Sequence, residues 1–215
     1  SYIRQVRKAN PNTLVVELGD MFGMAKSKFL VQGKLRAEAA IIAMSVIGYD
    51  AAVLGEADFQ FGAPFLLSMQ KKASFPFLVA TVTMPKAGKI FSSSVVRQFG
   101  NLRVGLIGVI DPEFKMQVRK SVESHSRIVP LFGELLSTIT AEVKALENKT
   151  DLNVVLFHME HSKARVLLTQ LNGVDVVITG HGLASFTTPE KIRNTYLVRT
   201  YGYEGKTVGR LDLQF

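Results

Sequence analysis

The sequence contains no cysteine. This absence excludes disulfide bonds, thiolate metal ligands and cysteine nucleophiles. The chain also lacks any stretch that approaches the roughly 18 uncharged apolar residues of a membrane-spanning helix. No internal repeat, low-complexity segment or long linker interrupts the 215 residues, so we expect one domain that spans residues 1–215.

No secretory signal peptide is recognisable in this chain. Residues 1–10 instead have the pattern of the end of an amphipathic helix, which Asn10, Pro11 and Asn12 would terminate. A chain that opens inside a helix is expected to continue upstream in the native protein.

The composition indicates a folded, basic protein. Hydrophobic residues make up 47% and charged residues 20% of the chain, which is ample material for a core and excludes disorder. The formal net charge of +8 favours anionic partners such as phosphates. The basic residues are scattered, however, and no basic stripe interleaves with aromatic residues as in single-strand nucleic-acid binders. Nucleic acid is therefore not the expected partner.

Short, continuous apolar runs alternate with helical patterns along the chain. Such runs are typical of strands that are buried on both faces. The predicted strands are residues 13–18, 51–54, 77–82, 104–110, 153–157, 175–179, 196–200 and 210–215. The predicted helices are residues 33–47, 64–72, 131–147 and 162–171. This alternation predicts a layered α/β fold with mixed sheets, closed by an antiparallel hairpin of the last two strands.

Polar residues with metal-binding chemistry follow several of these strands. In open α/β sheets ligands bind outside the carboxyl ends of the strands, so these residues are expected to meet. They are Asp20, Glu56, Asp58, Asp111, His158 and His181. Carboxylates and imidazoles that converge from separate strands predict a site for a divalent cation such as Mn, Fe, Zn or Mg.

Each of these residues also has a purely structural interpretation. Asp20 is typical of a helix N-cap or turn, and residues 55–58 are typical of a solvated turn before a helix. His158 fits a hydrogen-bonded core histidine, and residues 180–182 fit a plain turn. A shared location would explain all of them together, but the residues alone leave both interpretations open.

Segments from nearly the whole chain match one known family in type and order. Residues 10–22, with Gly19-Asp20, resemble a segment that ends in a metal-bridging aspartate. Residues 47–59 resemble the stretch that carries a Gly-Asn-His-Glu motif. Residues 154–158 and 173–183 resemble strands that end in a ligand histidine and in Gly-His-x-His. The chain thus resembles the 5'-nucleotidase branch of the calcineurin-like metallophosphoesterases.

This resemblance implies a β-sandwich of two sheets flanked by helices. It also implies a centre of two metals, about 3.5–4 Å apart, that orient a phosphate and activate a water for in-line attack. In the family a histidine of the Gly-Asn-His-Glu motif assists the departing oxygen.

The sequence departs from the family pattern at several functional positions. The Asp-x-His motif of the family's first strand has no counterpart, and Leu183 stands where the second histidine of Gly-His-x-His binds the same metal. Ala57 occupies the position of the catalytic histidine, and its acidic neighbour is shortened to Asp58. The family's C-terminal nucleotide-binding domain is also without a counterpart here. These departures predict that one metal position is lost.

The other metal position retains four ligands by resemblance. They are Asp20, Glu56, which replaces the family's asparagine, His158 and His181. We expect either one divalent cation (Mn, Zn, Fe or Mg) at this position or none.

Two functions follow from the resemblance. The first is a degenerate domain with weak or no phosphatase activity, which serves as a binding or structural module of a larger protein. The alternative is an active metal-dependent hydrolase of the 5'-nucleotidase or UDP-sugar hydrolase type with an altered metal site.

By resemblance, the ligand is a phosphorylated small molecule and the location is periplasmic or extracellular. A sheet edge left open by a missing first strand would favour a homodimer, and additional domains are expected in the full-length protein.

Overall fold

The computed structural model describes residues 2–23, 30–85, 88–123, 130–182, 188–199 and 207–214, with the side chains of residues 121–123 excepted. Within these residues no helix has both the length and the apolar character that crossing a membrane requires.

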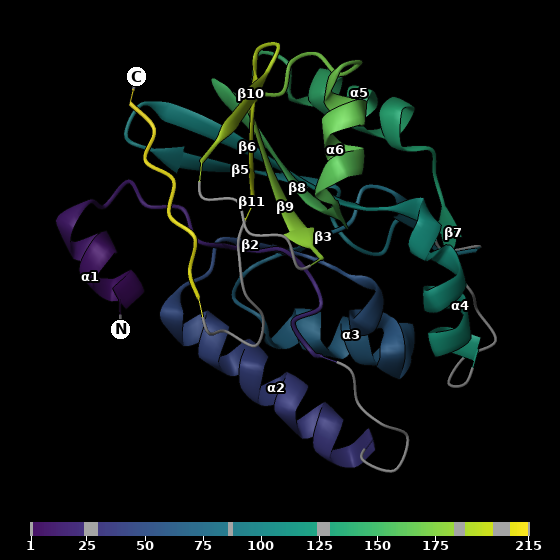
Figure 1. The fold of residues 1–215 in the computed structure, drawn as a ribbon. Coiled ribbons are helices and arrows are strands. Elements are labelled where there is room, and N and C mark those ends of the chain that lie inside the picture. Colours follow the sequence, from purple (N-terminus) through teal and green to yellow (C-terminus); the bar gives the residue numbers. More distant parts are fainter. Residues whose placement is uncertain are drawn as a thin grey trace.

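A six-stranded mixed sheet forms the centre of the molecule (Figure 1). Its spatial order is β10 (Glu190–Ile192), β11 (Thr195–Arg199), β9 (Val176–His181), β8 (Leu152–Glu160), β6 (Leu102–Ile110) and β5 (Ser94–Phe99). The four inner strands run parallel to one another, whereas the edge strands β5 and β10 pair antiparallel with β6 and β11. The parallel strands are continuous apolar runs, as expected for strands covered on both faces.

A smaller parallel sheet packs against the first. It contains β1 (Val16–Glu17), β2 (Ala51–Val53) and β3 (Phe77–Leu78), in that order. A separate antiparallel pair joins β4 (Val82–Thr83) to β7 (Leu131–Phe132). One buried cluster draws residues from both main sheets, including Leu18 and Val53 from the small sheet region and Leu106 and Val154 from the large sheet. The two sheets therefore form a sandwich.

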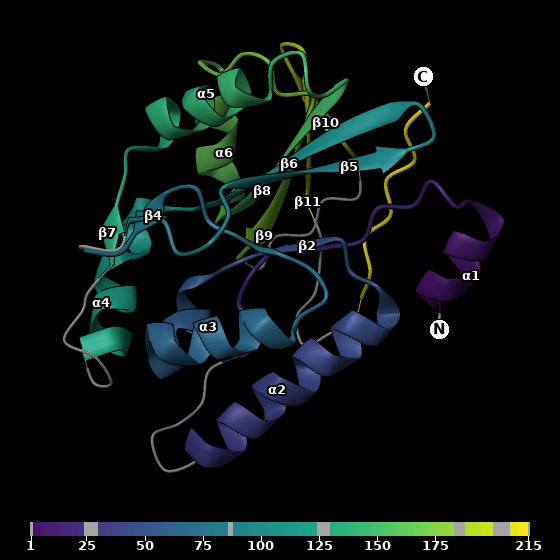
Figure 2. The same cartoon turned by 180° about the vertical axis from the view of Figure 1, so that it is seen from behind.

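Helices cover the two outer faces of this sandwich (Figures 1 and 2). On the side of the small sheet lie α2 (Leu30–Ile47) and α3 (Gly62–Lys72), and on the large sheet lie α5 (Leu135–Leu146) and α6 (His161–Leu168). The remaining helices are α1 (Tyr2–Ala9), α4 (Lys115–Glu123), and the 3₁₀ helices η2 (Glu56–Phe61) and η3 (Pro112–Phe114). The predicted layered α/β fold with mixed sheets is confirmed.

Some predicted elements differ from the structure. Residues 131–147, predicted as one helix, comprise β7 and α5. The predicted final strand at residues 210–215 is wrong where the structure describes it, because residues 207–214 form no regular element. The antiparallel hairpin is instead β10–β11, and since β11 also pairs with β9, it has strand neighbours on both sides. Residues 200–206 of the predicted hairpin lie outside the described residues.

Candidate metal centre

The two sheets bring four of the predicted residues together at one rim of the sandwich. Asp20 follows β1, Glu56 begins η2 directly after β2, His158 lies on β8, and His181 ends β9. Each offers one nitrogen or oxygen ligand atom, and these atoms all lie within 4.8 Å of one another. We refer to Asp20, Glu56, His158 and His181 as the ligand cluster.

The loop that carries Asp20 is held in an unusual backbone conformation. Gly19 has φ of +95° and Asp20 has φ of +60°, a region that non-glycine residues seldom adopt. The fully buried Asp58 stabilises this turn, because its carboxylate accepts backbone N–H groups of Asp20 at 2.8 Å, Phe22 at 3.0 Å and Gly55 at 2.9 Å. Asp58 therefore joins the loops that supply the two carboxylates of the ligand cluster.

His158 is fixed with one ring nitrogen directed at the carboxylates. Its Nδ1 lies 2.7 Å from the carbonyl oxygen of Leu18, and since a carbonyl can only accept, Nδ1 donates. The Nε2 atom then faces Glu56 Oε2 at 2.7 Å and Asp20 Oδ2 at 3.5 Å. Metal-binding histidines commonly donate the other ring N–H to a carbonyl or carboxylate in this way.

His181 is held in a similar manner by a carboxylate. Its Nδ1 lies 3.2 Å from Glu160 Oε1, and its Nε2 lies 3.3 Å from Glu56 Oε1. The Phe114 ring packs against both imidazoles, with centroid distances of 4.6 Å to His181 and 5.6 Å to His158. Both histidines are thus oriented by groups outside the ligand cluster.

The charges of the cluster are strongly coupled. Burial raises the pKa of Asp20 above its usual range, against the opposing charge of His158. Burial also acts to raise the pKa of Glu56, but hydrogen bonds with His158 and His181 outweigh it and hold this pKa well below its usual range. Burial acts to lower the pKa of His158, yet Glu56, Asp20 and the Leu18 carbonyl raise it to about 9. Without a metal ion, His158 is therefore protonated at neutral pH, and its Nε2–H faces the Glu56 carboxylate.

The donor set fits one divalent cation. When both imidazoles are neutral, the two carboxylates and the two Nε2 atoms direct lone pairs at a common region, where a divalent cation would supply the positive charge that the proton on His158 supplies without it. Carboxylate oxygen and imidazole nitrogen are ligands that zinc, manganese and iron accept, whereas an all-oxygen set would favour magnesium or calcium. His158 is also buried, so its position does not depend on solvent.

The other predicted site residues lie elsewhere or act differently. Ala57 is buried, and its backbone N–H donates to Asp20 Oδ1 at 2.8 Å. Asp111 caps η3 through the Glu113 N–H and pairs with Lys163 at 3.1 Å, so it does not join the ligand cluster. Leu183, predicted to mark the lost ligand of a second metal, lies outside the described residues.

Sequence reasoning missed Glu160 and Phe114. Glu160 is paired with His181 in the β8–β9 ladder, but an irregularity between Phe157 and Glu160 breaks the period of two, so the alternation along the strand could not have identified it. Phe114 follows β6 in η3, and nothing in its local sequence indicates that it packs on two histidines.

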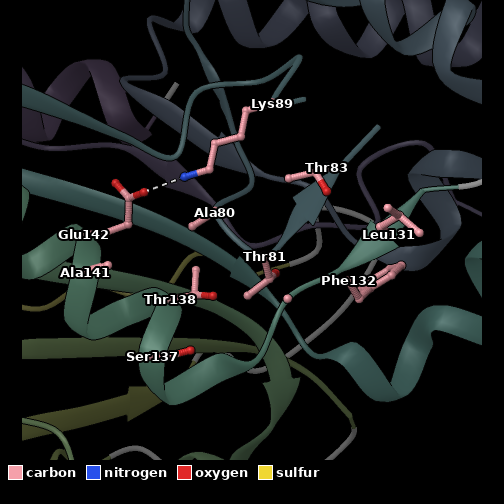
Figure 3. Close-up of a pocket in the computed structure, with 11 residues that line it drawn as sticks. Ala80, Thr81, Thr83, Lys89, Leu131, Phe132, Ser137, Thr138, Ala141 and Glu142 are labelled. Carbon is pink, nitrogen blue, oxygen red and sulfur yellow. Dashed lines mark hydrogen bonds and ion pairs between the residues drawn. The ribbon is translucent and has the colours of Figure 1, made fainter. Parts of the chain in front are cut away.

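A separate open pocket of about 420 Å³ lies beside β4, β7 and the start of α5 (Figure 3). Its lining includes Thr81, Ser137 and the Lys89–Glu142 ion pair, whose Nζ and Oε1 atoms are 2.7 Å apart. No member of the ligand cluster contributes to this lining, so the pocket is not part of the candidate metal centre.

No protein-family model matches the chain. In sequence, it is 25% identical over 250 residues to the trifunctional nucleotide phosphoesterase protein YfkN of Bacillus subtilis, which covers 99% of this chain and 17% of YfkN. It is 27% identical over 238 residues to the 5'-nucleotidase of Mus musculus, covering 99% of this chain and 39% of that protein. The chain therefore spans less than half the length of these relatives.

Solved structures have the same fold. A crystal structure of a 5'-nucleotidase precursor from Thermus thermophilus superposes with a TM-score of 0.75 at 24% identity, over 93% of this chain and 41% of that chain. The calcineurin-like phosphoesterase YfkN superposes with a TM-score of 0.69 at 24% identity, over 84% of this chain and 61% of that chain. The predicted resemblance is confirmed: the chain is similar in sequence to 5'-nucleotidases and to a nucleotide phosphoesterase, and it has the fold of calcineurin-like metallophosphoesterases.

Proposed function

We propose that this domain holds one divalent cation in the ligand cluster and binds a phosphorylated small molecule, with weak or no hydrolysis of its phosphoester bond. The observation that carries the proposal is the convergence of Asp20, Glu56, His158 and His181 within 4.8 Å, with both histidines already oriented.

Pre-oriented ligands favour cation binding. The Leu18 carbonyl fixes His158 and the Glu160 carboxylate fixes His181, so neither ring has to be ordered when a cation binds. Asp58 does the same for the backbone of the Asp20 loop. A bound divalent cation would polarise a phosphoryl oxygen and supply Lewis-acid chemistry.

The proposed loss of turnover rests on Ala57. By the family resemblance this position carries a histidine that assists the departing oxygen, and a methyl group can neither donate a proton nor a hydrogen bond. Loss of one acid–base group typically lowers a rate by about 10²–10⁴-fold. The Ala57 backbone N–H is engaged with Asp20, which leaves a positioning role at this residue.

The nature of the ligand is also part of the proposal. The net charge of +8 favours an anionic molecule, and the printed names of the relatives describe enzymes that act on nucleotides. Of the features of these substrates, we propose for this domain's ligand only the phosphate group that they share.

By the same resemblance we propose a periplasmic or extracellular location. Fractionation of the source cells would test this location, and recovery in the cytosolic fraction would contradict it.

The main alternative is an active phosphoester hydrolase. The intact ligand cluster favours it, since a cation positioned there would be available to a substrate phosphate. This alternative predicts sustained turnover in spite of Ala57.

Metal analysis and a turnover assay separate the two functions. Purified protein should bind about one equivalent of Mn²⁺ or Zn²⁺ and hydrolyse p-nitrophenyl phosphate slowly or not at all. His158→Gln should abolish the bound metal, whereas His161→Gln, a buried histidine hydrogen-bonded to Thr179, should not. Two bound ions with rapid turnover would establish the hydrolase, and protein without metal affinity would refute the proposed centre.

A further inference from the structure

The carboxylate of Asp111 is buried at the end of β6. Its side chain is only 4% exposed. The Oδ1 atom accepts the backbone N–H of Glu113 at 2.9 Å, and Oδ2 lies 3.1 Å from the Nζ atom of Lys163. A carboxylate that has lost its water is costly to the fold unless hydrogen bonds and a positive charge compensate. Lys163 supplies that charge.

This ion pair joins two segments that lead into the metal centre. Lys163 lies on α6, which begins directly after β8, and Asp111 opens the loop after β6, the parallel neighbour of β8. The backbone N–H of Asp111 also donates to the carbonyl oxygen of His158 at 3.1 Å. Glu113, in the same loop, is a second partner of Lys163. One ammonium group therefore holds this loop at two points.

The loop presents Phe114 to both histidines of the ligand cluster. Asp111 caps η3, and its carbonyl oxygen accepts the Phe114 N–H at 3.0 Å. The Phe114 ring is largely buried, and it lies against His181 and His158 at the centroid distances given above. Because Phe114 follows three residues after its cap, a displacement of Asp111 displaces the ring as well.

Helix α4 extends the same segment to the carboxylate side of the centre. It begins directly after Phe114 and packs on η2, the 3₁₀ helix whose first residue is Glu56. Val118 of α4 and Phe59 of η2 are fully buried in one apolar cluster, to which Phe114 also belongs. Residues 112–123, which we call the η3–α4 segment, thus contact elements that carry three of the four ligands.

We propose that Lys163 and Asp111 are positioning residues of the metal centre. Their ion pair fixes the η3–α4 segment so that Phe114 keeps the rings of His158 and His181 in the orientation that binds a cation. Neither residue belongs to the ligand cluster, so both act through Phe114 and the His158 backbone. The role in cation binding rests on the proposed function, whereas the packing of Phe114 on the imidazoles does not.

Calorimetric titration with Mn²⁺ tests the effect on the centre. In Lys163→Met the Asp111 carboxylate stays buried without a cation, and the loop has to move to bring it to water. Mn²⁺ affinity should fall by about 10-fold, the lower end of the effect of losing an outer partner. Lys163→Arg retains the charge and should retain most of the affinity. Lys89→Met is the matched control, because it breaks an ion pair with the largely buried Glu142 outside the centre and should leave affinity unchanged.

NMR of metal-free protein in chelator tests the position of Phe114 directly. Protons close to an aromatic ring are shifted by its ring current, and the chain has only four histidines, so their imidazole signals can be assigned by substitution. Phe114→Leu gives the signals in the absence of the ring. In Lys163→Met the His181 signal should move toward its position in Phe114→Leu, whereas Lys89→Met should leave it in place. An unchanged His181 signal in Lys163→Met would overturn the proposal.

A double variant tests whether the two residues act as a pair. Asp111→Asn keeps a side-chain oxygen that can cap η3 but removes the charge. If the ion pair is the unit, Lys163→Met combined with Asp111→Asn should lose no more Mn²⁺ affinity than Lys163→Met alone. Losses that multiply would show independent contributions and contradict the proposal. Wild-type protein without cation affinity would refute the proposed function instead, while the His181 signals would still decide the positioning role.

Discussion

Gly180 on β9 packs directly on Leu18, the residue that follows β1. A Cβ atom on Gly180 would lie 2.8 Å from the Leu18 carbonyl oxygen and would overlap the Leu18 side chain. The same carbonyl accepts the Nδ1–H of His158. The close approach of the two sheets at this glycine therefore helps to set the position of a histidine in the ligand cluster.

Gly180→Ala is accordingly expected to affect both stability and metal binding. The added methyl group must push Leu18 away, which should lower the free energy of unfolding by about 1–3 kcal/mol. It should also weaken Mn²⁺ affinity, because His158 loses its acceptor. Urea unfolding and calorimetric titration measure the two effects. Gly100→Ala is the control for metal affinity: no atom lies within 4 Å of a Cβ added there, so Mn²⁺ affinity should stay unchanged, although the positive φ of Gly100, which Gly180 does not share, lowers the stability of this variant as well.

Glu160 is expected to control metal affinity through His181. Glu160→Gln replaces the carboxylate that orients the His181 ring, and loss of such an outer partner typically weakens metal binding by about 10–100-fold. Calorimetric titration with Mn²⁺ or Zn²⁺ would measure this change. Glu190→Gln removes the carboxylate beside His161, a histidine outside the ligand cluster, and should leave affinity unaltered. Equal losses in both variants would contradict the assigned role.

Asp58 is expected to stabilise the folded state. In Asp58→Asn an amide N–H₂ replaces one of the two oxygens that accept backbone N–H groups. Because the site is fully buried, the mismatched donors should lower the free energy of unfolding by about 1–3 kcal/mol. Urea unfolding tests this value. A loss below about 0.5 kcal/mol, the usual size of a surface substitution's effect, would show that Asp58 has no such role.

The stability of metal-free protein should fall as the pH rises from about 6.5 to about 9. The pKa of His158 is raised to about 9 in the folded state, whereas an unfolded histidine titrates near 6.5. Between these values the folded state binds more protons, so its stability decreases with increasing pH. Unfolding curves in chelator across this range should show the decline. His158→Gln should reduce it, and a flat wild-type profile would contradict the stated charge state.

Ala57→His tests the proposed reason for weak turnover. If a proton donor is what this position lacks, the substitution should raise hydrolysis of p-nitrophenyl phosphate by up to about 10²-fold. Ala57→Gln, which adds comparable volume without an imidazole, should have no such effect. An unchanged rate in a folded, metal-loaded Ala57→His protein would place the limitation elsewhere.

Much of the fold and of the ligand cluster was predictable from the sequence. The parallel strands are recognisable in the sequence as continuous apolar runs. Asp20, Glu56 and His181 lie where those runs end. Because parallel strands of one sheet share the edge at which they end, position along the strand predicts that residues of the same sheet lie near each other. It does not show how the two sheets face each other, and the same rule wrongly placed Asp111 at the site, since Asp111 pairs with Lys163. Their role as metal ligands stays a prediction.

The parts that were not predicted depend on contacts between distant segments. The edge strand β5 is partly exposed and lacks a continuous apolar run, so its pairing with β6 is visible only in the folded structure. Phe114 packs on His158 and His181, which lie 44 and 67 residues further along the chain. Residues 210–214 have the composition of a strand but find no neighbouring strand in the structure. Local pattern therefore indicated which residues form elements, but not which partners complete them.

The two carboxylates of the ligand cluster follow strands of the small sheet, whereas both histidines lie on strands of the large one. A cation that contacts all four has affinity only for the assembled sandwich, and by mass action it adds about 2.7 kcal/mol to folding stability when its free concentration is a hundred times Kd. The supply of cation around the protein would then govern how often the two halves separate and become accessible to proteases. This dependence would hold even for a domain that never turns over a substrate.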